Sequence, residues 1–290
     1  MNFFNNIRYN NGVLCYDFED SINSGNSKNN RKLKSENRNN IKTLIESYSE
    51  KIDYNYLGFR INSPNSEFYN DDLNYINSLD GIRCIFLPKV ESHEMIENLI
   101  NDTNYKVTEI IPIIESFQAF QDLEYILSYR NERVNKFAFG HCDFNLDCGN
   151  YPFYHHENLQ YWKWIAYLND NAIKYRKQII NSPYLKLSNE FFFSQVISNL
   201  KKYESVTGQI TLCLKQTEAC NNNRYNVGKI QLSNKFESDV FQKAETYIEK
   251  FEKYLITDKS FALTSDKVLL SPQEYKSAKE FNKIFKNHLG

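Results

Sequence analysis

The chain has 290 residues, and its 35 lysines and arginines nearly balance its 36 aspartates and glutamates, giving a formal net charge of -1. A chain of this length can bury a substantial core, as one large barrel or as two modest domains. The charge balance supplies no global positive field, which argues against nucleic acid or a membrane as a partner. The sequence contains no Cys-x-x-Cys pair, no recognisable secretory signal and no apolar run of membrane-span length. These features predict a cytoplasmic protein.

The first half of the chain repeats one pattern, in which a short apolar segment ends in polar residues and is followed by helical spacing. We expect strands at 13–16, 56–61, 82–87, 110–114 and 137–139, and helices at 34–48, 72–79, around Met95 to Leu99, and at 117–127. Repetition of strand, polar strand end and helix favours a parallel β/α barrel or a doubly wound sheet.

Two acidic residues follow the two strands in the middle of the chain. Residues 110–114 form a continuous apolar run, typical of a strand buried on both faces, and the run ends at Glu115. Residues 137–139 form a second apolar run, which breaks at Gly140 and reaches Asp143. Parallel β/α folds place their ligand chemistry at the carboxyl ends of their strands. Glu115 and Asp143 are therefore candidate functional residues.

The second half of the chain is less regular. The aromatic stretch 151–168 reads as irregular, and it is followed by a helical and then strand-like segment at 172–180, a helix at 188–200 and a strand at 209–214. Residues 241–255 carry a regular amphipathic stripe, and Ser271-Pro272-Gln273-Glu274 is a capping box that opens a final helix. We expect a β/α barrel over 1–222 and a helical extension over 223–290, forming one structural domain.

Polar motifs follow one another at the predicted strand ends. They are Asp17-Phe18-Glu19-Asp20 with Lys34 and Arg38 downstream, Arg60-Ile61-Asn62, Pro88-Lys89-Val90-Glu91, Ile114-Glu115-Ser116, and Gly140 to Asp143. In this order and approximate spacing, the set resembles the citrate lyase beta subunit-like, or HpcH/HpaI aldolase, family. The resemblance implies a TIM (β/α)8-type barrel with a helical C-terminal extension, assembled as a trimer or hexamer. It also implies a lyase or aldolase that makes or breaks a carbon–carbon bond, with Mg²⁺ bound by Glu115 and Asp143.

The chemistry of such a reaction fits these residue types. Cleaving a small oxo- or hydroxy-acid leaves an enolate, whose negative charge must be stabilised as it develops. Carboxylates such as Glu115 and Asp143 suit Mg²⁺, which also keeps waters and takes oxygens from its substrate. Arg60 would pair with a substrate carboxylate or the developing oxyanion. Glu19 and Asp20 would hold metal waters, orient Arg60 or exchange a proton, and the sequence does not choose among these roles.

The resemblance also implies a substrate-binding set, with a simpler alternative for several residues. This set comprises Arg60, Asn62, Lys89 and Gly140. Lys89 could instead form a structural ion pair with Glu91. Arg60 could instead form a structural ion pair with Glu19 or Asp20. Lys34 and Arg38 have the alternative of a solvated helix face.

A second candidate metal site consists of His141, Cys142, Cys148, His155 and His156. Their spacing matches no common zinc pattern, so we favour Mg²⁺ as the cofactor over zinc. Trp162 and Trp164 are interpreted as core or oligomer contacts, because no basic stripe accompanies them.

Two departures from the family pattern bear on the substrate. The amino terminus lacks the family's first strand and its valine-proline-glycine turn, and residues 267–272 lack the acid that members acting on malyl thioesters carry there. Both absences argue against a coenzyme A thioester and leave the enolate-stabilising residues in place. The alternatives are a non-catalytic ligand-binding subunit of a larger complex and a metal-dependent ester or thioester hydrolase.

Overall fold

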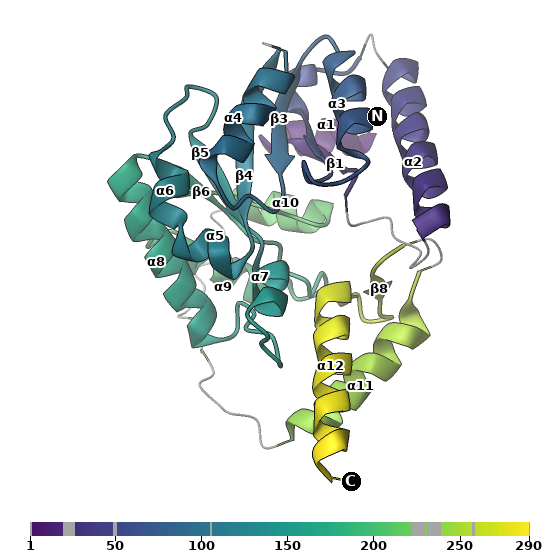
Figure 1. Ribbon diagram of the computed structural model, residues 1–290. Helices are drawn as coiled ribbons and strands as arrows, with labels where there is room; N and C mark the ends of the chain where they lie inside the picture. The colour runs from purple at the N-terminus through teal and green to yellow at the C-terminus, as the bar shows by residue number, and fades with distance from the viewer. Residues whose placement is uncertain are drawn as a thin grey trace.

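The computed structural model describes residues 2–19, 27–48, 51–104, 106–221, 230, 232, 239–256 and 259–289. Within these ranges, parallel strands form one sheet in which each strand pairs with the next along the chain. The strands are β1 (Leu14–Asp17), β2 (Leu57–Arg60), β3 (Ile82–Leu87), β4 (Val107–Ile114), β5 (Lys136–Phe139), β6 (Gln178–Asn181) and β7 (Val206–Gln209). The sheet curls into a half-barrel with helices along its outside (Figure 1).

The helices of the barrel part alternate with these strands. They are α1 (Asn2–Tyr9), α2 (Ser27–Ser47), α3 (Tyr69–Asn77), α4 (His93–Asp102), α5 (Phe117–Gln121), α6 (Leu123–Ser128), α7 (His141–Asp147), α8 (Leu159–Tyr175), α9 (Glu190–Leu200) and α10 (Leu214–Asn221), with a 3-10 turn η1 (Tyr54–Tyr56) before β2. In the described part of the chain, no helix is long and apolar enough to cross a membrane.

The expected parallel β/α architecture is confirmed, but the described strands form a half-barrel and not a closed eight-stranded barrel. In the described ranges the sheet has seven strands and its edge strands β1 and β7 do not pair. The segment before β1 is a helix, which buries Phe4 and Ile7, and α1 contacts both β1 and α10. The side chain of Asn221 donates to the carbonyl of Asn10 at this contact. Helix α1 therefore contacts both the edge strand β1 and α10.

The alternation of side chains in β4 explains why its whole apolar run is buried. Ile110 and Ile114 belong to the large core between the sheet and the outer helices. Ile111 and Ile113 face the inside of the half-barrel, where they form a second core with Cys84. Successive side chains in a strand point to opposite faces, so a strand covered on both faces needs apolar residues throughout.

Some predicted elements agree with the structure, and others differ. Strand β3 has the predicted bounds, whereas the helix expected at 117–127 is divided in two at Asp122. The aromatic stretch 151–168 is irregular only up to residue 158, because α8 runs from Leu159 and buries Tyr161 and Trp162. The strand expected at 209–214 lies earlier in the chain, as β7 from Val206 to Gln209, and residues 210–213 lead into α10.

The C-terminal extension consists of two helices and a short hairpin. They are α11 (Val240–Tyr254), β8 (Ala262–Leu263), β9 (Leu269–Leu270) and α12 (Pro272–Leu289). Phe251 of α11 stacks on Tyr275 of α12, with ring centroids 4.2 Å apart. The predicted capping box is confirmed, because the Ser271 hydroxyl accepts from the Glu274 N–H at 3.1 Å. Helix α12 begins beside α7 and extends away from the half-barrel (Figure 1). The predicted domain boundary at residue 222 lies outside the described residues and stays a prediction.

Candidate functional site

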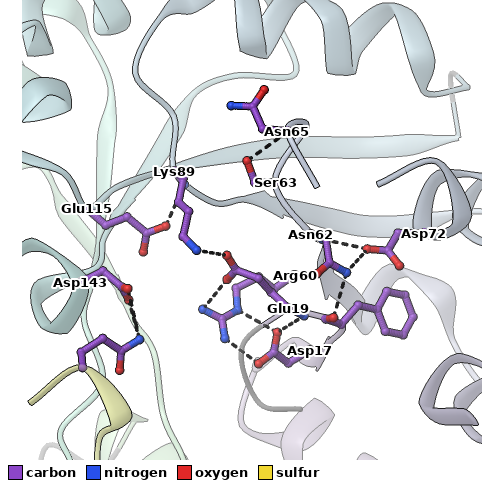
Figure 2. Close-up of polar contacts among 12 residues, drawn as sticks. Asp17, Glu19, Arg60, Asn62, Ser63, Asn65, Asp72, Lys89, Glu115 and Asp143 are labelled. Atoms are coloured by element: carbon purple, nitrogen blue, oxygen red, sulfur yellow. Dashed lines mark hydrogen bonds and ion pairs between the residues drawn. The ribbon is translucent and has the colours of Figure 1, made fainter. Parts of the chain in front are cut away.

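The register of the first two strands places an acid opposite an arginine. Asp17 and Arg60 are partners across β1 and β2, at the carboxyl ends of both strands. The Arg60 guanidinium donates to Asp17 through Nε at 2.8 Å and Nη2 at 2.6 Å, and its Nη1 lies 3.0 Å from Glu19 Oε2 (Figure 2). This bidentate contact fixes the plane of the guanidinium. Asp17 was not among the predicted site residues, although it begins the acidic motif.

Arg60, Asp17 and Glu19 form a group that we call the arginine cluster. Lys89 connects this cluster to Glu115 at the end of β4. Its ammonium lies 3.3 Å from Glu19 Oε1, and its backbone N–H donates to Glu115 Oε1 at 2.7 Å. The backbone of Lys89 has φ of 54°, a left-handed conformation that costs energy for a residue with a side chain. Lys89 thus forms an ion pair with Glu19, and Glu91 is exposed to solvent. Lys89 contacts both groups of acids at once.

Glu115 is a buried carboxylate at the end of β4, only 4% exposed. Burial is the main cause that raises its pKa well above the usual range, and the nearby charges of Asp143 and Glu19 raise it further. Gly140 provides the space beside it, because a Cβ at that position would lie 2.5 Å from Glu115 Oε2. The backbone N–H of Gly140 donates to the Ile114 carbonyl, which aligns the end of β5 with that of β4.

Asp143 lies on the first turn of α7, and a residue of the C-terminal extension contacts it. The side-chain amide of Gln273 donates to Asp143 Oδ1 at 3.2 Å and to Oδ2 at 3.0 Å (Figure 2). Gln273 was not predicted as a site residue, since the sequence marked it only as part of the capping box. No signal in the sequence pairs it with Asp143, 130 residues earlier.

Asn62 and its neighbours form a buried polar network beside the site. The Asn62 amide donates to the Phe18 carbonyl at 2.9 Å and to Asp72 at 2.6 Å, and it accepts from Lys34 at 2.7 Å. Arg38 pairs with Asp72 at 2.8 Å. Both basic residues are at most 9% exposed, so the alternative of a solvated helix face is wrong for them. The contacts of Asn62 point to a structural role, and we leave it out of the proposed site.

The structure brings together six of the predicted site residues. They are Glu19, Arg60, Lys89, Glu115, Gly140 and Asp143. Asp20 lies outside the described residues. The roles assigned to these residues stay predictions.

The histidine and cysteine cluster forms hydrogen bonds that suit a structural network. His141 Nε2 lies 3.0 Å from His155 Nδ1, and His155 Nε2 lies 3.1 Å from Glu274 Oε2. His156 is 1% exposed, and burial lowers its pKa to about 3. In the described ranges, no group of three or more histidine, cysteine, aspartate and glutamate side chains is arranged to hold a metal ion.

The site fits a divalent cation that completes its coordination with water and substrate. Glu115 and Asp143 are hard oxygen donors, and burial together with the charges of Asp143 and Glu19 raises the energy of the ionised Glu115 carboxylate. A cation between them would relieve that repulsion. Beside them, the arginine cluster presents a fixed guanidinium, and this arrangement can bind a small anionic ligand next to a metal ion.

Comparison with known proteins identifies the family. The model of the HpcH/HpaI aldolase/citrate lyase family matches residues 9–188. Among solved structures, RipC from Yersinia pestis has a TM-score of 0.57 at 19% identity, covering 72% of this chain and 86% of that chain. The citrate lyase beta subunit from M. tuberculosis, complexed with oxaloacetate and magnesium, has a TM-score of 0.57 at 13% identity, covering 72% and 85%.

A third structure extends the likeness over more of the chain. CitE from Mycobacterium tuberculosis, in complex with magnesium, acetoacetate and coenzyme A, has a TM-score of 0.55 at 10% identity and covers 93% of this chain and 90% of that chain. No curated protein matches the sequence. At these identities the structural likeness concerns the fold, and the family model covers more than half of the chain. The chain belongs to the HpcH/HpaI aldolase/citrate lyase family.

Proposed function

We propose that the protein is a Mg²⁺-dependent carbon–carbon lyase or aldolase that acts on a small oxo- or hydroxy-acid or its conjugate. The observation that carries this proposal is Glu115, a carboxylate that is 4% exposed and faces the charges of Asp143 and Glu19. A protein that buries like charges together destabilises itself unless a ligand compensates them. Family membership and the relatives complexed with magnesium and small acids support the same function.

Each residue of the site has a proposed role that its contacts support. Glu115 and Asp143 would hold the Mg²⁺ ion, which when bound supplies positive charge to the substrate oxygen where negative charge develops. Arg60 would bind the substrate carboxylate or the developing oxyanion, and Asp17 and Glu19 hold its guanidinium in place. Lys89 fixes Glu115 through its backbone N–H. Gly140 leaves the room that the Glu115 carboxylate needs.

Thermal unfolding with ligand tests the metal and acid site directly. Mg²⁺ with pyruvate or oxaloacetate should raise the melting temperature, because a ligand at 100 times its Kd stabilises the folded state by about 2.7 kcal/mol. The Glu115→Ala and Asp143→Ala variants should lose this shift. Glu91→Ala, which removes an exposed acid two residues from Lys89, is the matched control and should keep it. An unchanged shift in the site variants would refute the proposed metal site.

Product analysis then separates a lyase from the alternatives. The purified protein should split oxo- and hydroxy-acids from a panel into two carbon fragments in the presence of Mg²⁺. The panel includes acyl-thioesters, because one relative was solved with coenzyme A, although the sequence argues against a thioester here. Release of an acid and an alcohol or thiol without carbon–carbon cleavage would identify a hydrolase instead.

A second candidate is a barrel that binds metal and acid without turnover. It is favoured by the contacts of Arg60, because its Nε and Nη2 donate to Asp17 and its Nη1 lies 3.0 Å from Glu19 Oε2 in the protein itself. Under this function, the ligand-dependent melting shift is present but no product forms over the whole panel. The expected trimer or hexamer also remains a proposal, and sedimentation of the purified protein would test it.

A further inference from the structure

Gln273 stands out because it reaches the site from outside the half-barrel. It lies on the first turn of α12, and its Nε2 donates to both oxygens of Asp143 at 3.2 and 3.0 Å. An amide is a neutral donor, so it orients the carboxylate without supplying the positive charge that would compete with a cation. Carboxylates that bind metal ions are commonly held by such hydrogen bonds from residues behind them.

The first turn of α12 is anchored on two sides, which makes the position of Gln273 well defined. Glu274, 8% exposed, has its Oε2 3.1 Å from His155 Nε2, and His155 in turn contacts His141 on α7. On the other side, the Ser271 backbone N–H donates to the Tyr247 hydroxyl of α11 at 2.9 Å. The turn is therefore fixed to α7, the helix that carries Asp143, and to α11.

A further contact one turn along α12 strengthens this anchoring. The Ser277 hydroxyl donates to the Asn150 carbonyl at 2.7 Å, in the segment that follows α7. Because α12 is held at both its first and second turns, its first turn does not depend on Gln273 alone for its position. Replacing the Gln273 side chain should thus leave the helix in place.

We propose that Gln273 is a positioning residue that holds the Asp143 carboxylate ready for a divalent cation, so that the C-terminal extension completes the metal site of the half-barrel. The inference rests on the proposed function, because it assumes that Asp143 binds the metal ion. It goes beyond it in assigning a role at the site to a residue outside the segment 9–188 that matches the family model. Gln273 acts through Asp143 and need not touch the substrate.

Binding of Mn²⁺ alone, followed by electron paramagnetic resonance on the full chain, tests the proposal without requiring turnover. The Gln273→Met variant keeps the length of the side chain and removes the donor, and its Kd for Mn²⁺ should rise roughly 10-fold. Lys276→Met, an exposed change further along the same helix, is the matched control and should leave the Kd unchanged. The urea midpoints of both variants should equal that of the parent, which a merely structural role for Gln273 would not allow.

The remaining outcomes separate this inference from the proposed function. If Gln273→Met fails to fold, Gln273→Asn withdraws the amide by one methylene and should raise the Kd in the same way. Parent-like or tighter Mn²⁺ binding by a folded Gln273 variant overturns the positioning role, provided that Glu115→Gln abolishes binding. If the parent binds no Mn²⁺, or if Glu115→Gln leaves binding intact, the proposed metal site fails and this inference fails with it.

Discussion

Two groups of acids lie at the carboxyl end of the sheet, one at the end of β1 and the other after β4 and β5, and they differ in their partners within the protein. The paired side consists of Asp17 and Glu19 with their cations Arg60 and Lys89. The acidic side consists of Glu115 and Asp143, with the neutral Gln273 as a hydrogen-bond donor. Among the described residues, no lysine, arginine or histidine forms a salt bridge with Glu115. The paired side therefore joins each acid to a cation of the protein, whereas on the acidic side burial and the charges of Asp143 and Glu19 disfavour the ionised form of Glu115.

Breaking the paired side should produce the largest loss of stability. In Arg60→Met, Glu19 loses its guanidinium partner while its side chain is only 5% exposed. Removing one partner of a buried pair costs about 3–5 kcal/mol, and the remaining contact with Lys89 places the expected loss near the lower end. Urea unfolding at neutral pH measures it. Arg83→Met, which breaks a pair with Glu109 at a 36% exposed side chain, is the control and should cost at most about 1 kcal/mol.

An equal loss in both arginine variants would mean that the paired side contributes no more than an ordinary surface pair. That result would remove the contrast between the two groups of acids.

Filling the space on the acidic side should have the next largest effect. In Gly140→Ala the new Cβ would lie 2.5 Å from Glu115 Oε2 and 2.7 Å from Glu115 Cβ, so Glu115 or the end of β5 must move. Overpacking of this kind costs about 1–3 kcal/mol. Calorimetry should show a lower melting temperature and a smaller stabilisation by Mg²⁺. Gly208→Ala, whose nearest contact is the Ile180 side chain at 3.1 Å, should be milder; the reverse order would count against a tight fit at Gly140.

The pH dependence of the free energy of unfolding should reveal the cost of ionising the buried Glu115 carboxyl group. Its pKa is raised in the folded protein, so above the unfolded value of about 4.3 the folded state holds a proton that the unfolded state has lost. The free energy of unfolding of the metal-free protein should therefore fall as pH rises through this window, by at most about 1.4 kcal/mol per pH unit.

Glu115→Gln should remove this slope, so that the variant in EDTA gains stability relative to the parent as pH increases. Urea unfolding between pH 4.5 and 7 measures the difference. Parallel pH profiles for variant and parent would show that Glu115 is compensated within the protein, and the acidic side would then resemble the paired side.

Removing the exposed cation should have the smallest effect. The Lys89 side chain is 49% exposed, so its pair with Glu19 should contribute about 0.2–1 kcal/mol. Lys89→Met should lower the urea midpoint slightly in dilute buffer, and the difference should shrink in 1 M salt, where the Debye length is about 3 Å. If Lys89→Met lowered the free energy of unfolding as much as Arg60→Met does, Lys89 would contribute as much as Arg60 to the stability of the paired side.

The sequence predicts the strands of the first half well, because apolar runs ending in polar residues are a strong local signal. Strand β3 has the predicted bounds, and the acids after β4 and β5 lie together as their place in a parallel sheet required. Other elements depend on contacts that the sequence does not display. Helix α8 is rich in aromatic residues that favour strands locally, and it is helical because Tyr161, Trp162 and Ile165 pack into the core.

Site residues could be predicted where a polar motif follows a single strand. Contacts between segments that are far apart in the sequence could not be predicted. Arg60 and Glu19 could be singled out, whereas the pairing of Arg60 with Asp17 needs the register of β1 against β2. The spacing of Lys34 and Arg38 is also typical of a solvated helix face. Both side chains are buried because they donate hydrogen bonds to residues on other elements, Lys34 to Asn62 and Arg38 to Asp72. Spacing along one segment does not report such long-range partners.

The contact between α12 and α7 has a consequence for how this protein can diversify. Strand ends that carry the main polar residues are constrained by the sheet, since a change there disturbs pairing and packing together. The segment that carries Gln273 contacts the half-barrel through α7 and through the segments that follow α7 and β6, and it lies outside the stretch that matches the family model. Exchange or drift of this terminal segment would supply new side chains above Asp143 while the inherited barrel stays as it is. Substitutions at the start of α12 can thus change the surroundings of Asp143 without altering the residues at the strand ends.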